Sequence, residues 1–385
     1  MTMTWPPDGQ GQRATVERPH GRDATSTGRR LVTVVAGLLS LLLLVVSAGG
    51  WLALRYYDGK VTRVPLRFPA ADRRPADPGG DTQNILLVGS DSRAGTAGEF
   101  GEVDGQRSDT TILAHLDANG STTLASFPRD LWVTIPAYTD AAGHNHTGGK
   151  SKLNAAFALG GPSLLIRTIE GLTKIRIDHY LQIDFIGFQR MTDALGGVTV
   201  CVKPLPNGSR SNLDDKMSGW HGQVGDNSLN GEQALAFVRQ RYGLPEADLD
   251  RIRRQQQFIG VIFRAATSTS TLTNPVRLGS LMNAVTSAVS VDDATSLSDL
   301  APLAVRLRGV GTGGVRLATV PTSPGKISGQ SVLVTDPDKL ASFVAGLSGP
   351  QPSASAASAV VLVAAAVPAA ATTPAVAPPV SSCTY

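Results

Sequence analysis

Acidic and basic residues follow a short apolar segment in the first part of this 385-residue chain. The stretch Asn84–Arg93 runs from the apolar Ile85–Val88 into a turn that holds Asp91 and Arg93. A short apolar run bounded by turn residues is typical of a strand buried on both faces, and open α/β folds carry their chemistry just beyond such strand ends. A carboxylate and a guanidinium at this place suit a metal ion or a phosphate group, although a salt-bridged turn would have the same sequence.

Four more charged residues border the next two expected strands. Arg107 and Asp109 come just before one strand, and Arg129 and Asp130 come just after the other. A short turn joins the two strands, so they form a hairpin in which the start of the first lies beside the end of the second. We therefore expect these four side chains to share one edge of the sheet.

Cationic side chains recur at the ends of two later helices. Lys152 precedes a helix, and the N-terminus of a helix attracts anions. Arg239 and Arg241 lie where a second helix is expected to end, because Gly243 and Pro245 follow. On a continued helix the two arginines would point about 200° apart, whereas an extended chain beyond Arg239 directs both to one side.

The following helix carries Arg251, Arg254 and Gln255 at the spacing of one helical face. Like charges so placed destabilise a helix unless something negative lies between them. An anion held by this face is one interpretation. The alternative is a solvated basic face that pairs with the nearby acidic residues Glu246, Asp248 and Asp250.

Together these residue types favour the recognition and transfer of phosphate groups. Arginines bind phosphate oxygens through bidentate, charge-assisted hydrogen bonds. Asp91 and Asp109 suit a magnesium ion, which takes few carboxylates and leaves room for phosphate oxygens. Phosphoryl transfer needs charge neutralisation and positioning more than a covalent nucleophile. The sequence has no Walker loop, dinucleotide-binding glycine motif or zinc-protease motif, and its six histidines are too scattered to supply a serine hydrolase.

Composition narrows the class of protein further. The net charge of +4 is too small to indicate a nucleic-acid partner. The two cysteines, Cys201 and Cys383, have no metal-ligand spacing, which excludes a zinc site and a disulfide framework. The chain is long enough for one large domain with appendages.

An uncharged apolar stretch near the N-terminus predicts a membrane anchor. Residues 31–54 carry no charge and, at about 1.5 Å per residue, are long enough to cross a hydrocarbon core of about 30 Å. A cleaved signal peptide is the alternative, since Val46-Ser-Ala48 resembles a processing site. Basic residues lie on both sides of the stretch, so the positive-inside rule does not orient it.

Hydrophobic periodicity predicts an α/β fold with a mixed central sheet, because strand follows strand early and helix follows helix late. The expected strands are 84–88, 110–116, 122–127, 132–135, 179–184, 198–202, 315–320 and 331–334. The expected helices are 162–174, 186–195, 231–240, 248–266, 274–289, 296–307 and 337–346.

The ordered set of these motifs resembles the LytR–CpsA–Psr family. The resemblance rests on Asn84–Arg93, Arg107–Thr111, Phe127–Asp130, Lys152–Asn154, Asp178–Phe185, Leu195–Val200, Leu229–Leu235, Val238–Arg241 and Asp250–Gln256. Each motif is weak alone, and their number and order carry the resemblance. It implies an α/β/α sandwich with a mixed central sheet, preceded by a single N-terminal transmembrane helix, in a single-pass protein of the cell membrane whose catalytic domain is extracellular.

The resemblance also implies an activity and a set of site residues. Family members transfer a glycopolymer phosphate from a polyprenyl-pyrophosphate carrier to peptidoglycan and form a phosphodiester. Asp91 and Asp109 match the magnesium and pyrophosphate site. The positions that line the pyrophosphate are matched by Arg129, Lys152, Arg239, Arg241, Arg251 and Gln255, and less closely by Arg93 and Arg107. Arg254 joins this set through its helical spacing alone. The apolar helices 162–174 and 186–195 are candidate walls of a polyprenyl groove.

The same sequence patterns and resemblance predict how the chain is divided into segments. It comprises a disordered cytoplasmic tail (1–30), a transmembrane anchor (31–54), a linker (55–82), a catalytic domain (83–266), a C-terminal α/β part (267–348) and a low-complexity tail (349–385). A polyprenyl-pyrophosphate hydrolase and a non-catalytic wall-lipid binding protein are the alternatives, and a transcription attenuator fits less well. The sequence leaves open which polymer is transferred, which hydroxyl accepts it, what residues 270–350 do, the oligomeric state and whether Cys201 pairs with Cys383.

Overall fold

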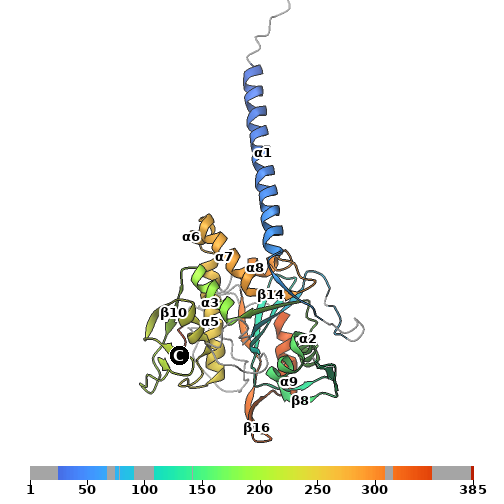
Figure 1. The fold of residues 1–385 in the computed structure, drawn as a ribbon, viewed down its shortest axis with the longest axis vertical. Helices are drawn as coiled ribbons and strands as arrows, with labels where there is room; N and C mark the ends of the chain where they lie inside the picture. The colour runs from blue at the N-terminus through green and yellow to red at the C-terminus, as the bar shows by residue number, and fades with distance from the viewer. Residues whose placement is uncertain are drawn as a thin grey trace, which may run out of the picture. The chain divides into compact units, whose positions relative to one another are not determined.

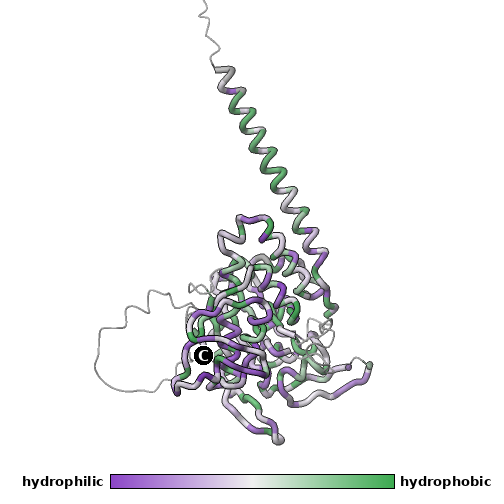
Figure 2. The backbone as a smooth tube through the Cα atoms, turned by 60° about the vertical axis from the view of Figure 1, so that its left-hand side comes forward, coloured by the Kyte–Doolittle hydropathy of each residue, from purple (hydrophilic) through white to green (hydrophobic). Residues whose placement is uncertain are grey.

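The computed structural model describes residues 25–66, 74–77, 79–90, 108–140, 142–307, 315–348 and 383–385. The chain divides into two compact units, Met1–Ala53 and Leu54–Tyr385 (Figure 1). Helix α1 (Thr25–Asp58) begins before the span that the sequence predicts. Its part Leu31–Asp58 is long and apolar enough to cross a membrane, and Figure 2 shows the run of hydrophobic residues along it.

A seven-stranded mixed sheet forms the centre of the second unit. Three neighbouring strand pairs are parallel and three are antiparallel, which confirms the expected mixed sheet. The strand order is β1 (Thr62–Val64), β14 (Val289–Asp292), β9 (His179–Asp184), β2 (Gln83–Ser90), β3 (Ser108–Leu116), β4 (Thr122–Phe127) and β15 (Arg316–Thr319).

Helices cover both faces of this sheet (Figure 1). On one face, Leu86 and Leu113 of the sheet share a buried cluster with Leu165 of α2 (Leu153–Thr173) and Leu340 of α9 (Pro337–Ala345). Residues of the other face pack against α5 (Asp248–Ala266) and α8 (Ala301–Arg306). The central segment Ile85–Val88 is therefore covered from both sides, as its uniform apolar character predicts.

Smaller elements complete the unit. The remaining helices are α3 (Phe185–Ala194), α4 (Gly231–Arg239), α6 (Thr269–Leu272), α7 (Pro275–Ala288) and the 3₁₀ helix η3 (Gly346–Ser348). The two-stranded sheets pair β5 (Trp132–Ile135) with β8 (Gly149–Lys152), β6 (Tyr138–Thr139) with β7 (Asn145–His146), β10 (Val198–Val202) with β13 (Gly225–Leu229), β11 (Asp214–Asp215) with β12 (Trp220–His221), and β16 (Ser323–Ile327) with β17 (Gln330–Val334).

The segment after residue 267, whose role the sequence left open, is part of this fold. It supplies the strands β14 and β15 to the central sheet. The helix α7 lies between α5 and β14 in the chain and contacts α3. The sheet is therefore incomplete without residues beyond the motif-bearing region.

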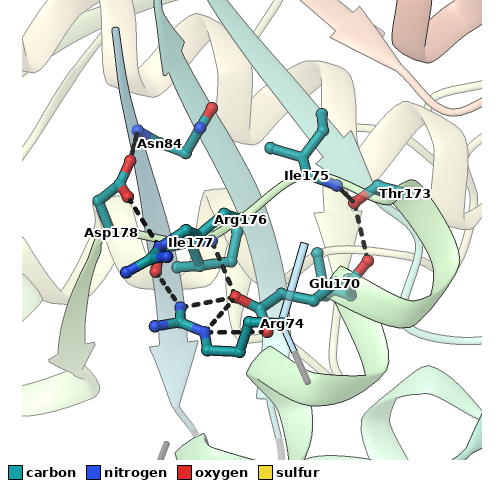
Figure 3. A network of polar contacts seen from close by, with 9 residues as sticks. Arg74, Asn84, Glu170, Thr173, Ile175, Arg176, Ile177 and Asp178 are labelled. Carbon is teal, nitrogen blue, oxygen red and sulfur yellow. Dashed lines mark hydrogen bonds and ion pairs between the residues drawn. The ribbon is translucent and has the colours of Figure 1, made fainter. Parts of the chain in front are cut away.

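The expected linker is attached to the fold at two points. Strand β1 pairs with β14, with Thr62 opposite Ser290. Further along, an Nη2 of Arg74 lies 2.6 Å from Oε1 of Glu170 in α2 and 2.5 Å from the carbonyl oxygen of Ile177 (Figure 3). Both side chains of this ion pair are more than nine-tenths buried, so the described parts of the segment do not behave as a free stalk.

The last described residues are also held in place. Cys383 forms a disulfide with Cys201 of β10. Thr384 bridges to Val202, and its hydroxyl donates to Oε1 of Gln257 at 3.1 Å. The pairing that the sequence left open is thus present, and it returns the end of the chain to the β10–β13 sheet.

Candidate active site

The hairpin of β3 and β4 brings an acidic and a basic residue together, as predicted. Thr111 pairs with Phe127, so the start of β3 lies beside the end of β4. An Nη1 of Arg129 lies 2.6 Å from Oδ1 of Asp109. Burial alone would lower the pKa of Arg129, but the neighbouring carboxylates, Asp109 first, raise it above its ordinary value. Arg129 therefore remains a cation at every physiological pH.

A chain of alternating charges extends from this pair in two directions. On one side Arg129 lies 3.8 Å from Asp130, which pairs with Lys152 at 2.8 Å. On the other side Nε of Arg129 lies 3.8 Å from Asp248, whose Oδ1 is 2.6 Å from Arg251. Neither oxygen of Asp248 has a geometrically well-formed hydrogen bond within the described residues. Asp248 is therefore held beside the two arginines mainly by charge.

Three of these charged residues, Asp109, Arg129 and Arg251, line a cavity of about 740 Å³. Its floor is one face of the central sheet, including Leu87 and Gly89 of β2, Ile112 of β3 and Ile183 of β9. Its walls come from α3, α5 and α7, and its lining is mainly apolar. The predicted site residues that line it are Asp109, Arg129, Arg239, Arg241, Arg251 and Gln255. The cavity therefore joins a cationic region to a long apolar space.

The end of α4 directs Arg239 and Arg241 into the cavity together, as the sequence predicts. The helix ends at Arg239, and Gln240 adopts an extended backbone with ψ of 133°. The fully buried Gln240 side chain donates to the carbonyls of Ser211 and Tyr242, which fixes the bend. Within the described residues neither arginine has a carboxylate within ion-pair distance. Two unpaired cations that face one cavity suit an anionic ligand.

The bend requires a glycine at position 243. Its φ is +77°, and a Cβ there would lie 2.2 Å from the carbonyl oxygen of Ser211. Any larger residue would meet both backbone strain and a clash with the main chain. The glycine that predicted the helix end is thus also needed for the turn that follows Arg241.

Arg251 and Gln255 lie side by side on α5. Burial lowers the pKa of Arg251, and Asp248 offsets this effect only in part. The side-chain amide of Gln255 donates to the carbonyl oxygen of Val238 at 3.4 Å, which links α5 to α4. An additional negative charge in the cavity would therefore relieve the cost of burying the Arg251 cation.

The structure corrects the placement of Arg254. Its side chain is fully buried and lies outside the cavity, where its guanidinium donates to carbonyl oxygens of Asn212 and Tyr385 at 2.8 and 2.6 Å. It also lies 4.4 Å from the ring centroid of Phe237. Burial lowers its pKa to about 9. The spacing that groups it with Arg251 is right, but α5 is buried on that side as well, so Arg254 secures the core.

The other predicted residues have different outcomes. Lys152 does not line the cavity; it pairs with Asp130, which lies 3.8 Å from the cavity-lining Arg129. Asp91, Arg93 and Arg107 lie outside the described residues, and their site roles stay predictions. Asp91 follows Ser90 in the sequence, and Ser90 pairs with Ser108, the residue before Asp109.

Two site features differ from the sequence reading. The sequence predicts Asp248 only as a pairing partner of a solvated basic face, yet it lies between Arg129 and Arg251. Its position three residues before Arg251, in the first turn of α5, was the available signal. Of the two candidate groove walls, α3 lines the cavity through Phe185, Phe188 and Met191, whereas α2 packs on the opposite face of the sheet.

A family model described as the LytR_cpsA_psr family matches residues 67–348. The chain belongs to the LytR–CpsA–Psr family. The family match covers the central sheet except β1, and it covers the described cavity residues except Leu54 and Val61. It therefore assigns the segment beyond residue 267 to the same family domain as the earlier motifs.

Relatives in the family support this assignment. The probable cell wall biosynthesis protein LcpB of Corynebacterium glutamicum is 34% identical over 302 residues, which are 76% of this chain and 65% of the length of LcpB. The teichoic acid transferase TagU of Enterococcus faecalis is 31% identical over 254 residues, 65% of this chain and 75% of TagU. The LytR-Csp2A-Psr enzyme of Actinomyces oris has the same fold, with a TM-score of 0.55 at 21% identity over 75% of this chain and 96% of that one.

Proposed function

We propose that this protein is a membrane-anchored phosphotransferase that moves a glycopolymer phosphate from a polyprenyl-pyrophosphate carrier to peptidoglycan. Two relatives, LcpB and TagU, are described as a cell wall biosynthesis protein and a peptidoglycan teichoic acid transferase. The observation that carries the proposal is the cavity, which joins the unpaired Arg239 and Arg241 to a long apolar space. An amphiphile with a pyrophosphate head and a hydrocarbon chain has this combination of properties.

In this proposal the cationic region binds the pyrophosphate. Arg239 and Arg241 contact its oxygens directly, because no carboxylate of the described residues competes for them. Arg129 and Arg251 join them by giving up part of their contact with Asp109 and Asp248. The apolar floor and the walls from α3 and α7 hold the polyprenyl chain.

The reaction then follows from charge placement. A hydroxyl oxygen of peptidoglycan attacks the phosphorus that carries the glycopolymer, the hydroxyl proton is released to water, and the bond from that phosphorus to the bridging oxygen breaks. Polyprenyl phosphate leaves with an added negative charge. Arginines fixed beside that oxygen stabilise the charge as it develops, which is the principal need of phosphoryl transfer.

Magnesium is part of the proposal. Asp109 offers a half-buried carboxylate at the cavity. Asp91 follows Ser90, the last residue of β2, and Ser90 pairs with Ser108, the residue before Asp109. Two carboxylates with room for phosphate oxygens fit the ligand preference of this ion. The described residues contain no group of three or more acidic, histidine or cysteine side chains that could hold a metal by themselves. When bound, the ion would supply neutralisation of the pyrophosphate charge.

We also propose that the catalytic unit lies outside the cell, attached by α1 to the cell membrane. Helix α1 has the length and composition of a single span. Substrate and acceptor are then both accessible, since a polyprenyl carrier lies in the membrane and peptidoglycan lies beyond it. Labelling of an introduced cysteine by a membrane-impermeant reagent in intact cells would test this orientation.

The transfer reaction can be tested with the full-length protein in nanodiscs. The assay supplies magnesium and a polyprenyl-pyrophosphate saccharide, and measures transfer to a peptidoglycan fragment and release of phosphate. We expect Arg239→Ala and Asp109→Ala each to lose about 100-fold in rate, the usual cost of removing one oxyanion-binding group. Arg190→Ala is the matched control, because Arg190 is exposed on α3 and does not line the cavity.

The possible results separate the competing functions. Wild-type rates in both site variants would contradict the site assignment. Phosphate release without transfer would favour a hydrolase. Tight donor binding without either reaction in the wild type would favour a lipid-binding protein. The saccharide donor that the protein accepts identifies the polymer, and the peptidoglycan fragment that receives it identifies the acceptor hydroxyl.

A further inference from the structure

Helix α6 and the start of α7 carry exposed apolar residues at one end of the second unit (Figure 1). The side chains of Leu272 and Val276 are 43% and 75% exposed. Arg264 and Arg277 are exposed beside them in the sequence, and residues 265–291 include no acidic residue. Isolated exposed apolar residues are common on soluble proteins. Whether this surface binds a partner is therefore argued from its position in the fold.

That position is set by contacts with the end of α1 inside the second unit. Nζ of Lys60 lies 2.9 Å from Oδ1 of Asn283 in α7. A Cβ placed on Gly279 would lie 4.0 Å from the hydroxyl oxygen of Tyr57. Lower residue numbers in α7 thus lie nearer to lower residue numbers in the segment 57–60, so the two segments point the same way at these contacts.

Strand pairing gives the same direction independently. Strand β1, which follows α1, is parallel to β14, which follows α7, with Thr62 opposite Ser290. Both helices therefore enter the same edge of the sheet from the same side. The N-terminus of α7 therefore lies toward the apolar part of α1, and its C-terminus lies toward Lys60.

This geometry defines the level of the exposed residues. Three residues before Tyr57 is Leu54, and three residues before Gly279 is Val276; both steps rise about 4.5 Å along a helix. Leu54 belongs to the apolar span Leu31–Asp58. Val276 is then level with the end of the membrane span, and Leu272 of the preceding helix lies farther in the same direction.

We propose that α6 and the first turn of α7 lie in the lipid headgroup layer of the bilayer that α1 crosses. Leu272 and Val276 enter the boundary of the acyl chains, while Arg264 and Arg277 contact headgroup phosphates. A segment such as 265–291, with exposed apolar residues, an exposed arginine and no acidic residue, has the chemistry of an interfacial helix. Its occupant is the bilayer because Leu54–Asp58, which precede the contact of Lys60 with α7 inside the second unit, are also the end of the apolar span.

The placement gives α7 two functional sides. Leu281, Met282 and Val285 line the cavity, together with Leu54 at the end of α1. Val276 and Arg277 lie exposed at the start of the same helix. The apolar wall of the cavity therefore adjoins the membrane-facing surface, and a polyprenyl chain could reach the cavity with little exposure to water. This last consequence rests on the proposed function, whereas the membrane contact does not.

The contact can be measured without any activity assay. The full-length Val276→Cys protein, labelled with a nitroxide, is reconstituted in nanodiscs of phosphatidylglycerol and phosphatidylcholine. Both native cysteines are joined in a disulfide, so the introduced thiol is the one available for labelling. The control is Val224→Cys, since Val224 is 51% exposed in the turn between β12 and β13.

Collision of each label with oxygen, which concentrates in lipid, and with a water-soluble nickel complex gives its surroundings. We expect the label at position 276 to collide more with oxygen and less with nickel than the label at 224. Equal collision rates at the two positions would overturn the proposal. A label at Leu272→Cys repeats the test on α6, and circular dichroism of each labelled protein verifies that the fold is intact.

Discussion

Asp248 and Arg251 form an ion pair of 2.6 Å in which the two side chains are only 13% and 5% exposed. The same carboxylate lies 3.8 Å from Arg129, so one acidic side chain holds two arginines of the cavity. In a site proposed to bind pyrophosphate, Asp248 supplies negative charge beside these arginines while the substrate is absent. It compensates the buried Arg251 and the half-buried Arg129, and under the proposal it yields them in part when the substrate binds.

We expect Asp248→Asn to make the unliganded protein less stable and more responsive to anions. Removing one partner of a buried pair costs about 3 kcal/mol, because the other charge is left uncompensated. Inorganic pyrophosphate that binds between the arginines restores that compensation, so it should raise the melting temperature more in the variant than in the wild type. Thermal unfolding of the full-length protein, with and without pyrophosphate, measures both effects.

Asp250→Asn is the matched control for this prediction. Asp250 pairs with Arg253 at 2.5 Å with the same spacing on the same helix, but neither residue lines the cavity. The control should lose stability and show no additional response to pyrophosphate. An equal response in the two variants would mean that Asp248 does not compete with the ligand.

The apolar cavity predicts a dependence on the length of the lipid chain. Leu87 lies on the floor, on the central strand β2, where it pairs with Leu181 of β9 and Ile112 of β3. We expect Leu87→Trp to fill the space that a long polyprenyl chain occupies. Transfer from a long-chain donor should fall at least about tenfold, equivalent to about 1.4 kcal/mol of lost binding, while a short-chain donor is little affected.

Turnover of the two donors by the same protein preparation provides the internal control. Misfolding would reduce both rates together, whereas a blocked chain site reduces only one. If the long-chain donor retains its rate in Leu87→Trp, the hydrocarbon chain does not occupy this part of the cavity.

Local sequence was sufficient for much of the fold. The boundaries of α5 agree with the prediction, because its apolar positions repeat with helical period and acidic residues fill its first turn. The sequence predicts one helix after Lys152 and another over 162–174, because Gly160 and Gly161 usually stop a helix. The structure has a helical segment on each side of these glycines, with a kink at them, and both segments pack on the sheet.

Features that depend on distant contacts were less predictable. Helical period groups Arg254 with Arg251, but it does not show that Arg254 is covered by the last residues of the chain. The sequence predicts a helix over 274–289 and no strand after it, because the pairing partners β1 and β9 of β14 lie far away in sequence. The convergence of Asp109 and Arg129 was predictable, since a single short hairpin joins them.

The disulfide predicts a large and reversible effect on stability. Cys201 and Cys383 are separated by 182 residues, and closing a long loop restricts the unfolded chain strongly. We expect Cys383→Ser to reduce the free energy of unfolding by about 2–5 kcal/mol. Denaturant unfolding with and without dithiothreitol measures it. The reductant should bring the wild type to the level of the variant, and a reductant effect on Cys383→Ser would show that it acts elsewhere.

The buried His115 predicts a loss of stability in acid. The side chain is 6% exposed, and its Nδ1 lies 2.7 Å from Oδ1 of Asn84. Burial lowers its pKa below the ordinary 6.5, and the opposing charge of Asp117 only reduces this effect. Below about pH 6.5 the unfolded chain therefore binds a proton that the folded protein does not, so unfolding becomes more favourable as the pH falls.

This contribution is at most about 1.4 kcal/mol for each pH unit. Because other groups titrate in the same range, this contribution is measured as the difference in stability between the wild type and His115→Gln. The stability of His115→Gln should be lower than that of the wild type at pH 7, since the contact with Asn84 is altered. Between pH 7 and pH 5 it should fall less steeply than the wild type. Parallel pH profiles of the two proteins would show that His115 takes up its proton as readily in the folded state as in the unfolded chain.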